Sequence, residues 1–312
     1  MARPLRIEFP GAYYHITSRG NERKAIFKNM GDRESFLSYL KLAYLRYGAV
    51  IHVFCLMNNH YHLLLETPKG NLSQIMRYIN GAYSTYFNVK HKRTGHLFQG
   101  RYKAILVDAD EYAGELSRYI HLNPVRAGIV DIPEKYAWSS YQYYVGKKKK
   151  PDWLAIDFIH SYFKHNILST EENYANFVLA KIYDHSDNPL EETVGSTILG
   201  NDKFIEKITE KYLKDKKIDR DLPALRELKK IERIDLVHEA AKSLLEGRDV
   251  ISRKAALYIC HHFSGKTLKE IGNHFGISES AVSLASSRFS QQLKKNGKLK
   301  KKIELIQNKL NL

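Results

Sequence analysis

The stretch from Met57 to Glu66 constrains this chain more than any other, because two histidines one residue apart stand inside an apolar run that reads as buried strand. Side chains alternate between the two faces of a strand, so His60 and His62 project from one face and Tyr61 from the other. Neutral imidazoles suit divalent metals, and a pair on a rigid strand needs one or two further ligands. A His-x-His pattern also occurs by chance, so a second element is needed to favour a metal site.

A second pattern stands at residues 108 to 123. Its composition predicts a helix over residues 108 to 122, with acidic residues in the first turn and Pro124 ending it. Positions four apart share a helix face, which places Glu115, Tyr119 and Asn123 in one row. A tyrosine hydroxyl can attack a phosphate, and an amide oxygen can bind the metal that holds the phosphate. The structural alternative is that Tyr119 packs against a sheet and Asn123 ends the helix.

Four motifs in this order resemble the Y1 transposases. They are Gly11 to Asn21, His60-Tyr61-His62, Phe98 to Tyr102 and Tyr119 to Gly128. The histidine motif is similar to the His-hydrophobic-His motif of HUH nucleases. Together the motifs resemble the single-tyrosine transposases of the insertion sequence 200/605 type and their REP-associated relatives, over roughly the first half of the chain.

This resemblance implies a metal-dependent, ATP-independent endonuclease and strand transferase acting on single-stranded DNA, with a short hairpin as the expected substrate. By the motif match the nucleophile is Tyr119. The implied ligands of a divalent metal, Mg or Mn, are His60, His62 and Asn123. The family's third ligand is a polar residue one helical turn after the tyrosine, and Asn123 is shorter than the glutamine found there, which limits its reach.

The predicted element order is strand, helix, strand, strand, helix, strand, helix. It favours an α+β fold: a ferredoxin-like four-stranded antiparallel sheet with helices, followed by an all-α C-terminal region. The strand at residues 11 to 18 and the strand bearing His60 and His62 would be central. The last helix must then cross the exposed face or an edge of the sheet, either within one chain or across a homodimer. His15 is a candidate outer contact to the metal ligands, although a lone strand histidine is more often structural.

The net charge of +16 is unevenly distributed. Residues 1 to 146 carry +8, residues 147 to 150 add +4, residues 151 to 222 carry −5 and residues 223 to 312 carry +9. Basic ends of this kind attract a polyanion such as nucleic acid, although excess lysine also serves solubility. Because no apolar run is long enough to span a bilayer and both cysteines lie in apolar patterns, we expect no membrane partner and a cytoplasmic, nucleoid-associated protein.

The last segment has the layout of a helix-turn-helix, at about residues 267 to 290. Gly272 permits close helix crossing, Gly276 supplies the turn and Ser278 caps the second helix. The segment resembles the helix-turn-helix of the C-terminal domain of the replication initiator DnaA, which implies duplex binding; a plain structural helix pair is the alternative. The residues predicted to contact DNA are Arg19, Arg23, Lys24, Lys92, Arg93, Arg101 and Arg126 in the first region and Ser280, Ser283, Ser287 and Arg288 in the last.

Three regions are expected: a catalytic domain at residues 1 to 146, a helical middle region without a chemical motif at residues 147 to 222, and a helical DNA-binding domain at residues 223 to 312. The rival to a strand-transferring enzyme is a catalytically silent, sequence-specific DNA-binding regulator. An RNA-binding module would fit the charge and the aromatic content but leaves His60, His62 and Tyr119 unexplained.

Overall fold

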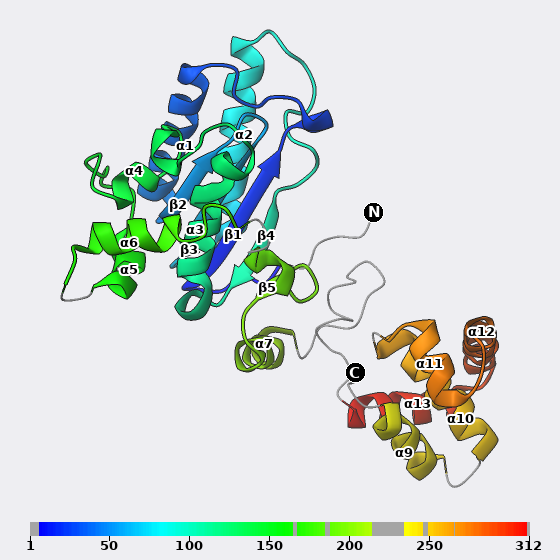
Figure 1. Ribbon diagram of the computed structural model, residues 1–312. Helices are drawn as coiled ribbons and strands as arrows, with labels where there is room; N and C mark the ends of the chain where they lie inside the picture. The colour runs from blue at the N-terminus through cyan, green and yellow to red at the C-terminus, as the bar shows by residue number, and fades with distance from the viewer. Residues whose placement is uncertain are drawn as a thin grey trace. The chain divides into compact units, whose positions relative to one another are not determined.

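The computed structural model describes residues 6–164, 167–184, 188–213, 234–245, 249–264 and 266–310. The chain forms two compact units, Arg6–Asp202 and a second unit that begins at Lys203 (Figure 1). The predicted boundary at residue 222 lies outside the described residues. Within the described ranges no helix is long and apolar enough to cross a membrane.

The first unit is built on a mixed sheet in the order β2-β3-β1-β4-β5. Its strands are β1 (Ala12–Arg19), β2 (Val50–Leu56), β3 (His60–Thr67), β4 (Lys103–Val107) and β5 (Ile198–Leu199). The first four strands are antiparallel, and β1 and β3 lie at the centre of these four, as predicted. The number of strands was predicted wrongly, because β5 pairs in parallel with the outer edge of β4. A two-residue strand has no alternation of its own to reveal it in the sequence.

Helices α1 (Met30–Tyr47) and α2 (Leu72–Lys90) cover one face of the sheet. The ring of Tyr61 on β3 packs 4.7 Å from the ring of Phe36 on α1, measured between centroids, and its hydroxyl donates to Asn80 Oδ1 on α2 at 2.6 Å. Because Tyr61 points away from its neighbours along the strand, both flanking histidines face the opposite side of the sheet.

Helix α3 (Ala109–Arg126) packs on that opposite face, against β2 and β3. The helix was predicted to end before Pro124, but it continues to Arg126 with Pro124 inside it. Proline has no N–H, so the bond from position 124 to the Ile120 carbonyl is missing, but the helix continues for two residues beyond it. Gly128, with φ of 65°, then turns the chain.

The segment after α3 closes both edges of the sheet. The chain near Trp138 and Ala155 bonds to the outer edge of β2, and β5 covers β4. It also contains the short helices α4 (Tyr141–Tyr144) and α5 (Asp157–His160) and helix α6 (Thr170–Leu179). The middle region was predicted as residues 147 to 222; its described part up to Asp202 belongs to the first compact unit.

A buried polar cluster attaches this segment to α3. His121 Nδ1 lies 2.7 Å from the Tyr174 hydroxyl on α6, and His121 Nε2 lies 2.7 Å from Ser140 Oγ. Ser117 Oγ lies 2.9 Å from the same Tyr174 hydroxyl. Burial lowers the pKa of His121 to about 3, so its ring is neutral in the folded protein.

The second unit is helical in its described residues. Its helices include α7 (Asp202–Ile208), α9 (Ile234–Leu244), α10 (Asp249–Phe263), α11 (Leu268–Phe275), α12 (Glu279–Lys295) and α13 (Gly297–Lys309). Between α11 and α12, Gly276 adopts φ of 65° and Ser278 Oγ accepts from Ala281 N. A Cβ on Gly272 would lie 2.5 Å from Ile277 O, so this glycine permits the close approach of the turn to α11.

Candidate active site on the α3 face of the sheet

His60 and His62 lie side by side on the face of the sheet that α3 covers. Their ring centroids are 5.0 Å apart. His62 is 6% exposed, while His60, at the start of β3, is half-buried. Burial lowers the pKa of both rings, and a second contribution comes from Arg19 for His60 and from His15 for His62. Both histidines are therefore neutral near pH 7 and can act as ligands.

Each of these histidines has a partner that restricts its ring. His60 Nδ1 lies 2.7 Å from Asn59 Oδ1, and because an amide oxygen can only accept, Nδ1 carries the proton and Nε2 keeps its lone pair. His62 Nδ1 lies 3.0 Å from Nε2 of His15. If His62 donates its Nδ1 proton to His15 Nε2, then His62 Nε2 also keeps its lone pair. This is the arrangement that orients metal-binding imidazoles in other proteins.

Tyr119 on α3 faces this pair. Its ring centroid lies 6.1 Å from that of His62 and 6.3 Å from that of His15, edge-on to both. Arg126 is the last residue of α3, and its Cζ lies 5.1 Å from the centre of the Tyr119 ring. Burial raises the pKa of the Tyr119 hydroxyl, and the positive charge of Arg126 opposes that rise. The structure thus brings together His60, His62 and Tyr119, from elements far apart in the sequence.

Asn123 follows Tyr119 by one helical turn, as predicted. In the described part of the chain its side chain donates from Nδ2 to the Tyr119 carbonyl at 2.9 Å. The amide is therefore held against its own helix, and its oxygen is the atom left for a ligand. The structure does not bring this oxygen into hydrogen-bond contact with the histidines, so a metal ligand role for Asn123 stays a prediction.

A divalent metal needs further ligands besides His60 and His62. Among the described residues, no group of three His, Cys, Asp or Glu side chains is arranged to hold a metal ion. Two neutral imidazoles with oriented rings fit two positions of a metal, and an amide oxygen, water or substrate oxygen would have to complete the set. The two imidazoles therefore fit part of a metal site, and the metal itself stays a prediction.

A tight loop beside the histidines supports His60. Gly20 begins it with φ of −59°, and glycine is required there by close contact, since a Cβ would lie 2.1 Å from Lys24 O. Glu22 and Arg23 adopt positive φ angles of 54° and 58°. The Asn59 amide that holds His60 also donates to Arg23 O at 3.1 Å. Such strain persists where the surroundings fix the backbone.

The basic residues predicted to contact DNA do not form one cluster. Arg19 and Arg126 lie near the histidines and the tyrosine. Lys24 pairs with Glu22 at 2.7 Å, and Arg93 donates to the His96 carbonyl at 2.8 Å within its own loop. Lys92 and Arg23 are exposed. Arg101 lines a pocket on the α2 side of the sheet.

The predicted contact residues of the second unit lie on one exposed stretch of α12. Ser280, Ser283, Ser287 and Arg288 are all exposed, while Val282 and Phe289 are buried. Ala281 and Ala285 are half-buried, and Ser286 is fully buried. The same exposed surface also carries Leu284, which is 52% exposed. Duplex binding by this surface remains a prediction.

The sequence did not single out Asn59, and it did not reveal where Arg126 lies. The amide of Asn59 orients His60. Arg126 was predicted as a phosphate contact, and its position beside the Tyr119 ring was not foreseen. The available signal was the placement of Asn59 directly before the histidine motif, and of Arg126 two turns after the tyrosine on one helix.

Residues 8–123 match the profile of a family described as "Transposase IS200 like". The match supports the resemblance that the four motifs predicted, and it ends at Asn123. No curated protein gives a significant match. A solved structure of a REP-associated tyrosine transposase, bound there to a REP hairpin, is similar to this chain with 17% identity and a TM-score of 0.42, over 54% of this chain and 100% of that one.

Proposed function

We propose that the first unit cuts and rejoins single-stranded DNA through a covalent bond between Tyr119 and a 5′-phosphate. The observation that carries the proposal is the position of the Tyr119 ring, 6.1 Å from that of His62 and on a helix that crosses the histidine face. The similarity of residues 8–123 to IS200-like transposases supports the same chemistry. The structural alternative for Tyr119 explains its packing but not the oriented, neutral histidines before it.

In the proposed reaction the Tyr119 oxygen attacks the scissile phosphorus. The bond from that oxygen to phosphorus forms, the bond from phosphorus to the 3′ oxygen breaks, the tyrosine proton leaves, and the departing 3′ oxygen takes up a proton. A free 3′-hydroxyl can later attack the same phosphorus and release Tyr119. The phosphodiester is conserved in the covalent link, so no ATP is required.

The side chains have separate roles in this scheme. His60 and His62 would hold a divalent metal, Mg or Mn, with Asn123 as the proposed third ligand. When bound, that metal supplies Lewis-acid polarisation of the phosphate and favours ionisation of the nearby phenol. Arg126 acts in the same direction on the phenol, since it opposes the pKa increase that burial causes. His15 restricts the orientation of the His62 ring, and Asn59 restricts that of the His60 ring.

We propose duplex binding for the second unit. The exposed serines of α12 and Arg288 would face a groove, and the lysine-rich residues 294 to 302 would contact phosphates. The proposed division is therefore a catalytic region within residues 1 to 146 and a duplex-binding region within residues 223 to 312. Assembly of two chains into a homodimer is compatible with this scheme, and so is a site formed by one chain.

The proposal is tested with labelled hairpin DNA that carries a single-stranded flank, incubated with the protein and Mn²⁺. We expect a covalent adduct that survives denaturing electrophoresis and is absent when the metal is chelated. In the variant His60→Ala/His62→Ala we expect no adduct and weaker Mn²⁺ binding by calorimetry, because one amide cannot hold a divalent ion. Unchanged Mn²⁺ affinity in that variant would make the histidines structural.

The rival proposal is a DNA-binding regulator without chemistry. It predicts hairpin binding by the wild-type protein but no adduct at any concentration of Mn²⁺. The described residues at the predicted site positions are all chemically competent, which favours the enzyme.

A further inference from the structure

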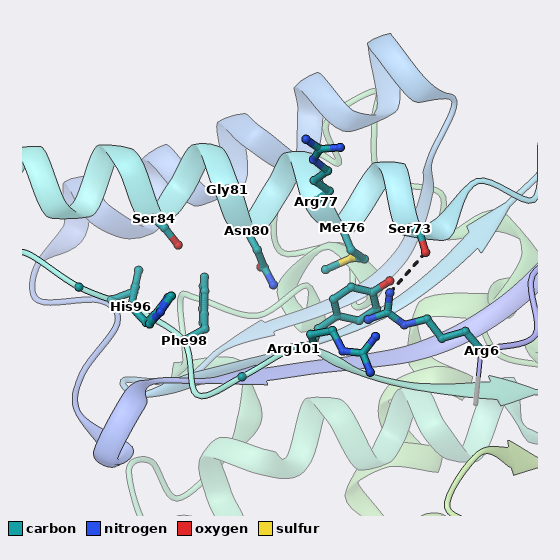
Figure 2. A pocket seen from close by; sticks show the side chains of 14 residues that line it. Arg6, Ser73, Met76, Arg77, Asn80, Gly81, Ser84, His96, Phe98 and Arg101 are labelled. Atoms are coloured by element: carbon teal, nitrogen blue, oxygen red, sulfur yellow. Dashed lines mark hydrogen bonds between the residues drawn. The ribbon is translucent and has the colours of Figure 1, made fainter. Parts of the chain in front are cut away.

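A pocket lies on the other face of the sheet, between α2 and the segment at residues 95–102 (Figure 2). Its volume is about 520 Å³, within the range of ordinary ligand sites. The pocket lies on the face toward which Tyr61 points, since the Tyr61 hydroxyl donates to the pocket residue Asn80. None of the residues that line the pocket is acidic.

The walls of the pocket combine an aromatic floor with polar and cationic groups. Phe98 and Tyr102 are 8% and 7% exposed and supply flat apolar surface. Asn80 and Ser84 on α2 face the 95–102 segment across the pocket (Figure 2), and Arg101 lies at its rim. Aromatic side chains beside a basic groove are the usual means of holding an unpaired base and its phosphate.

Two buried polar atoms of this pocket have no partner. The Tyr102 hydroxyl and Arg6 Nη2 are buried without a hydrogen bond among the described residues. The Arg6 guanidinium lies 4.2 Å above the Tyr102 ring, and its other terminal nitrogen, Nη1, reaches Ser73 Oγ at 3.4 Å. Ser73 itself is engaged by Glu8, which lies outside the pocket lining. A buried donor without a partner is unfavourable. Both atoms are covered by the protein itself, and it is the rest of the Arg6 side chain that lines the pocket.

Gly81 is an exposed residue in the wall of the pocket. It stands inside α2, where glycine is less favourable than alanine by about 1 kcal/mol. A Cβ at Gly81 would meet no heavy atom within 4 Å, so neither packing nor backbone conformation requires glycine there. What the missing side chain preserves is space in the pocket.

The 95–102 segment also connects the pocket to the histidine end of the sheet. Gln99 N donates to Arg19 O at 2.8 Å, and Arg19 Nη2 donates to Gln99 Oε1 at 2.8 Å. Arg19 is the register partner of His60. A DNA strand that passes Arg19 and Gln99 would therefore be close to His60 on the catalytic face. It would also be close to the pocket, because Phe98, the residue before Gln99, lines it.

We propose that this pocket binds one unpaired nucleotide of the single-stranded DNA substrate, with its base on the floor formed by Phe98 and Tyr102 and its phosphate toward Arg6 and Arg101. The proposal rests on the proposed function for the identity of the ligand. It adds a specificity-determining contact away from the reacting phosphate, on the face of the sheet that α3 does not cover.

The test compares two labelled single strands of about 16 units: oligothymidylate, and a polymer of abasic deoxyribose phosphates with the same charge. Binding to the full chain is measured by fluorescence anisotropy in EDTA, so that no cleavage occurs. Wild-type protein should prefer oligothymidylate. Gly81→Leu should bind oligothymidylate about tenfold more weakly, the size of one base-stacking contact, and bind the abasic polymer unchanged. The matched control is Ser38→Leu, which adds the same side chain at an exposed position of α1 and should bind both strands as wild type does.

A second variant, Arg101→Gln, should weaken both strands and reduce the slope of log affinity against log salt by about 0.7, the value for one single-strand phosphate. Equal binding of oligothymidylate by Gly81→Leu and wild type, or equal wild-type affinity for the two strands, would overturn the proposal. If the wild-type protein shows base-dependent binding in EDTA but forms no adduct in Mn²⁺, the proposed cleavage chemistry is contradicted, whereas the proposal that the pocket binds a nucleotide is not.

Discussion

At the scale of single residues, the chemistry of His62 depends on a neighbour that is not itself a candidate ligand. His15 is 1% exposed and lies 3.0 Å from His62 Nδ1 through its Nε2. Its other nitrogen is buried without a hydrogen-bond partner in the described chain, so the contact with His62 is the one that fixes the His15 ring.

We therefore expect His15→Phe to lower Mn²⁺ affinity by about 10- to 100-fold, the usual effect of removing a residue that orients a metal ligand. Isothermal titration calorimetry measures this directly. The matched control is His52→Phe, which replaces another buried strand histidine that bonds instead to Ala155 O and Glu66. Equal Mn²⁺ affinity in wild type and His15→Phe would show that His15 is purely structural.

The neutral state of His121 makes a prediction for stability against pH. Its folded pKa is about 3, against 6.5 for an ordinary histidine, so below pH 6.5 the unfolded state binds more protons than the folded state. The stabilising contribution of neutral His121 is complete above pH 6.5 and is lost as the pH falls toward 3, at about 1.4 kcal/mol for each pH unit. Urea unfolding of wild type and His121→Gln between pH 7 and 4 should show a smaller pH dependence in the variant; equal dependence would contradict the assignment.

At the scale of elements, the approach of α11 to the turn before α12 depends on Gly272. In Gly272→Ala the new Cβ would lie 2.5 Å from the Ile277 carbonyl, a backbone atom that cannot move aside easily. We expect the free energy of unfolding of the second unit to fall by about 1–3 kcal/mol, despite the better helix propensity of alanine. Differential scanning calorimetry resolves the effect, and Gly297→Ala, whose Cβ meets nothing within 4 Å, serves as the control that should show no loss.

Elements with strong local patterns were predictable, and elements defined by distant contacts were not. The strand pair at residues 50–67 and helix α1, which ends at Gly48 with φ of 69°, follow from alternation, helical spacing and a glycine cap. Strand β5 and the cluster around Tyr174 could not be predicted, because they exist through pairing with residues many positions away. Continuation of α3 past Pro124 was missed because a proline usually ends a helix, whereas here the helix runs two residues beyond it.

At the scale of the whole molecule, the predicted site required knowledge of how the elements pack. His60, His62 and Tyr119 could be chosen by motif and by strand and helix periodicity, and the structure places His15, the predicted outer contact, 3.0 Å from His62. The role of Asn59 and the pocket at Gly81 depend on residues that no local pattern connects.

The two units should contribute separately to DNA binding. Deletion of residues 223 to 312 should leave cleavage of a minimal hairpin largely unchanged and weaken binding to longer DNA with duplex flanks. The slope of log affinity against log salt should fall by about 0.9 for each duplex phosphate no longer contacted. Anisotropy titrations on both substrates at several salt concentrations measure this. Full-length affinity and slope in the truncated protein would mean that the second unit is not a DNA-binding module.

The central claim is that Tyr119 is the nucleophile, and the direct measurement is covalent adduct formation on hairpin DNA in Mn²⁺ by the variant Tyr119→Phe. That variant loses one hydroxyl and keeps the ring that packs 6.1 Å from His62, so we expect folding and DNA binding near wild type and no adduct. Tyr112→Phe, on the same helix with its hydroxyl bonded to Glu192, is the control that should form adduct normally. Persistent adduct in Tyr119→Phe, with its loss in Tyr112→Phe or Tyr102→Phe, would contradict the account and place the nucleophile elsewhere.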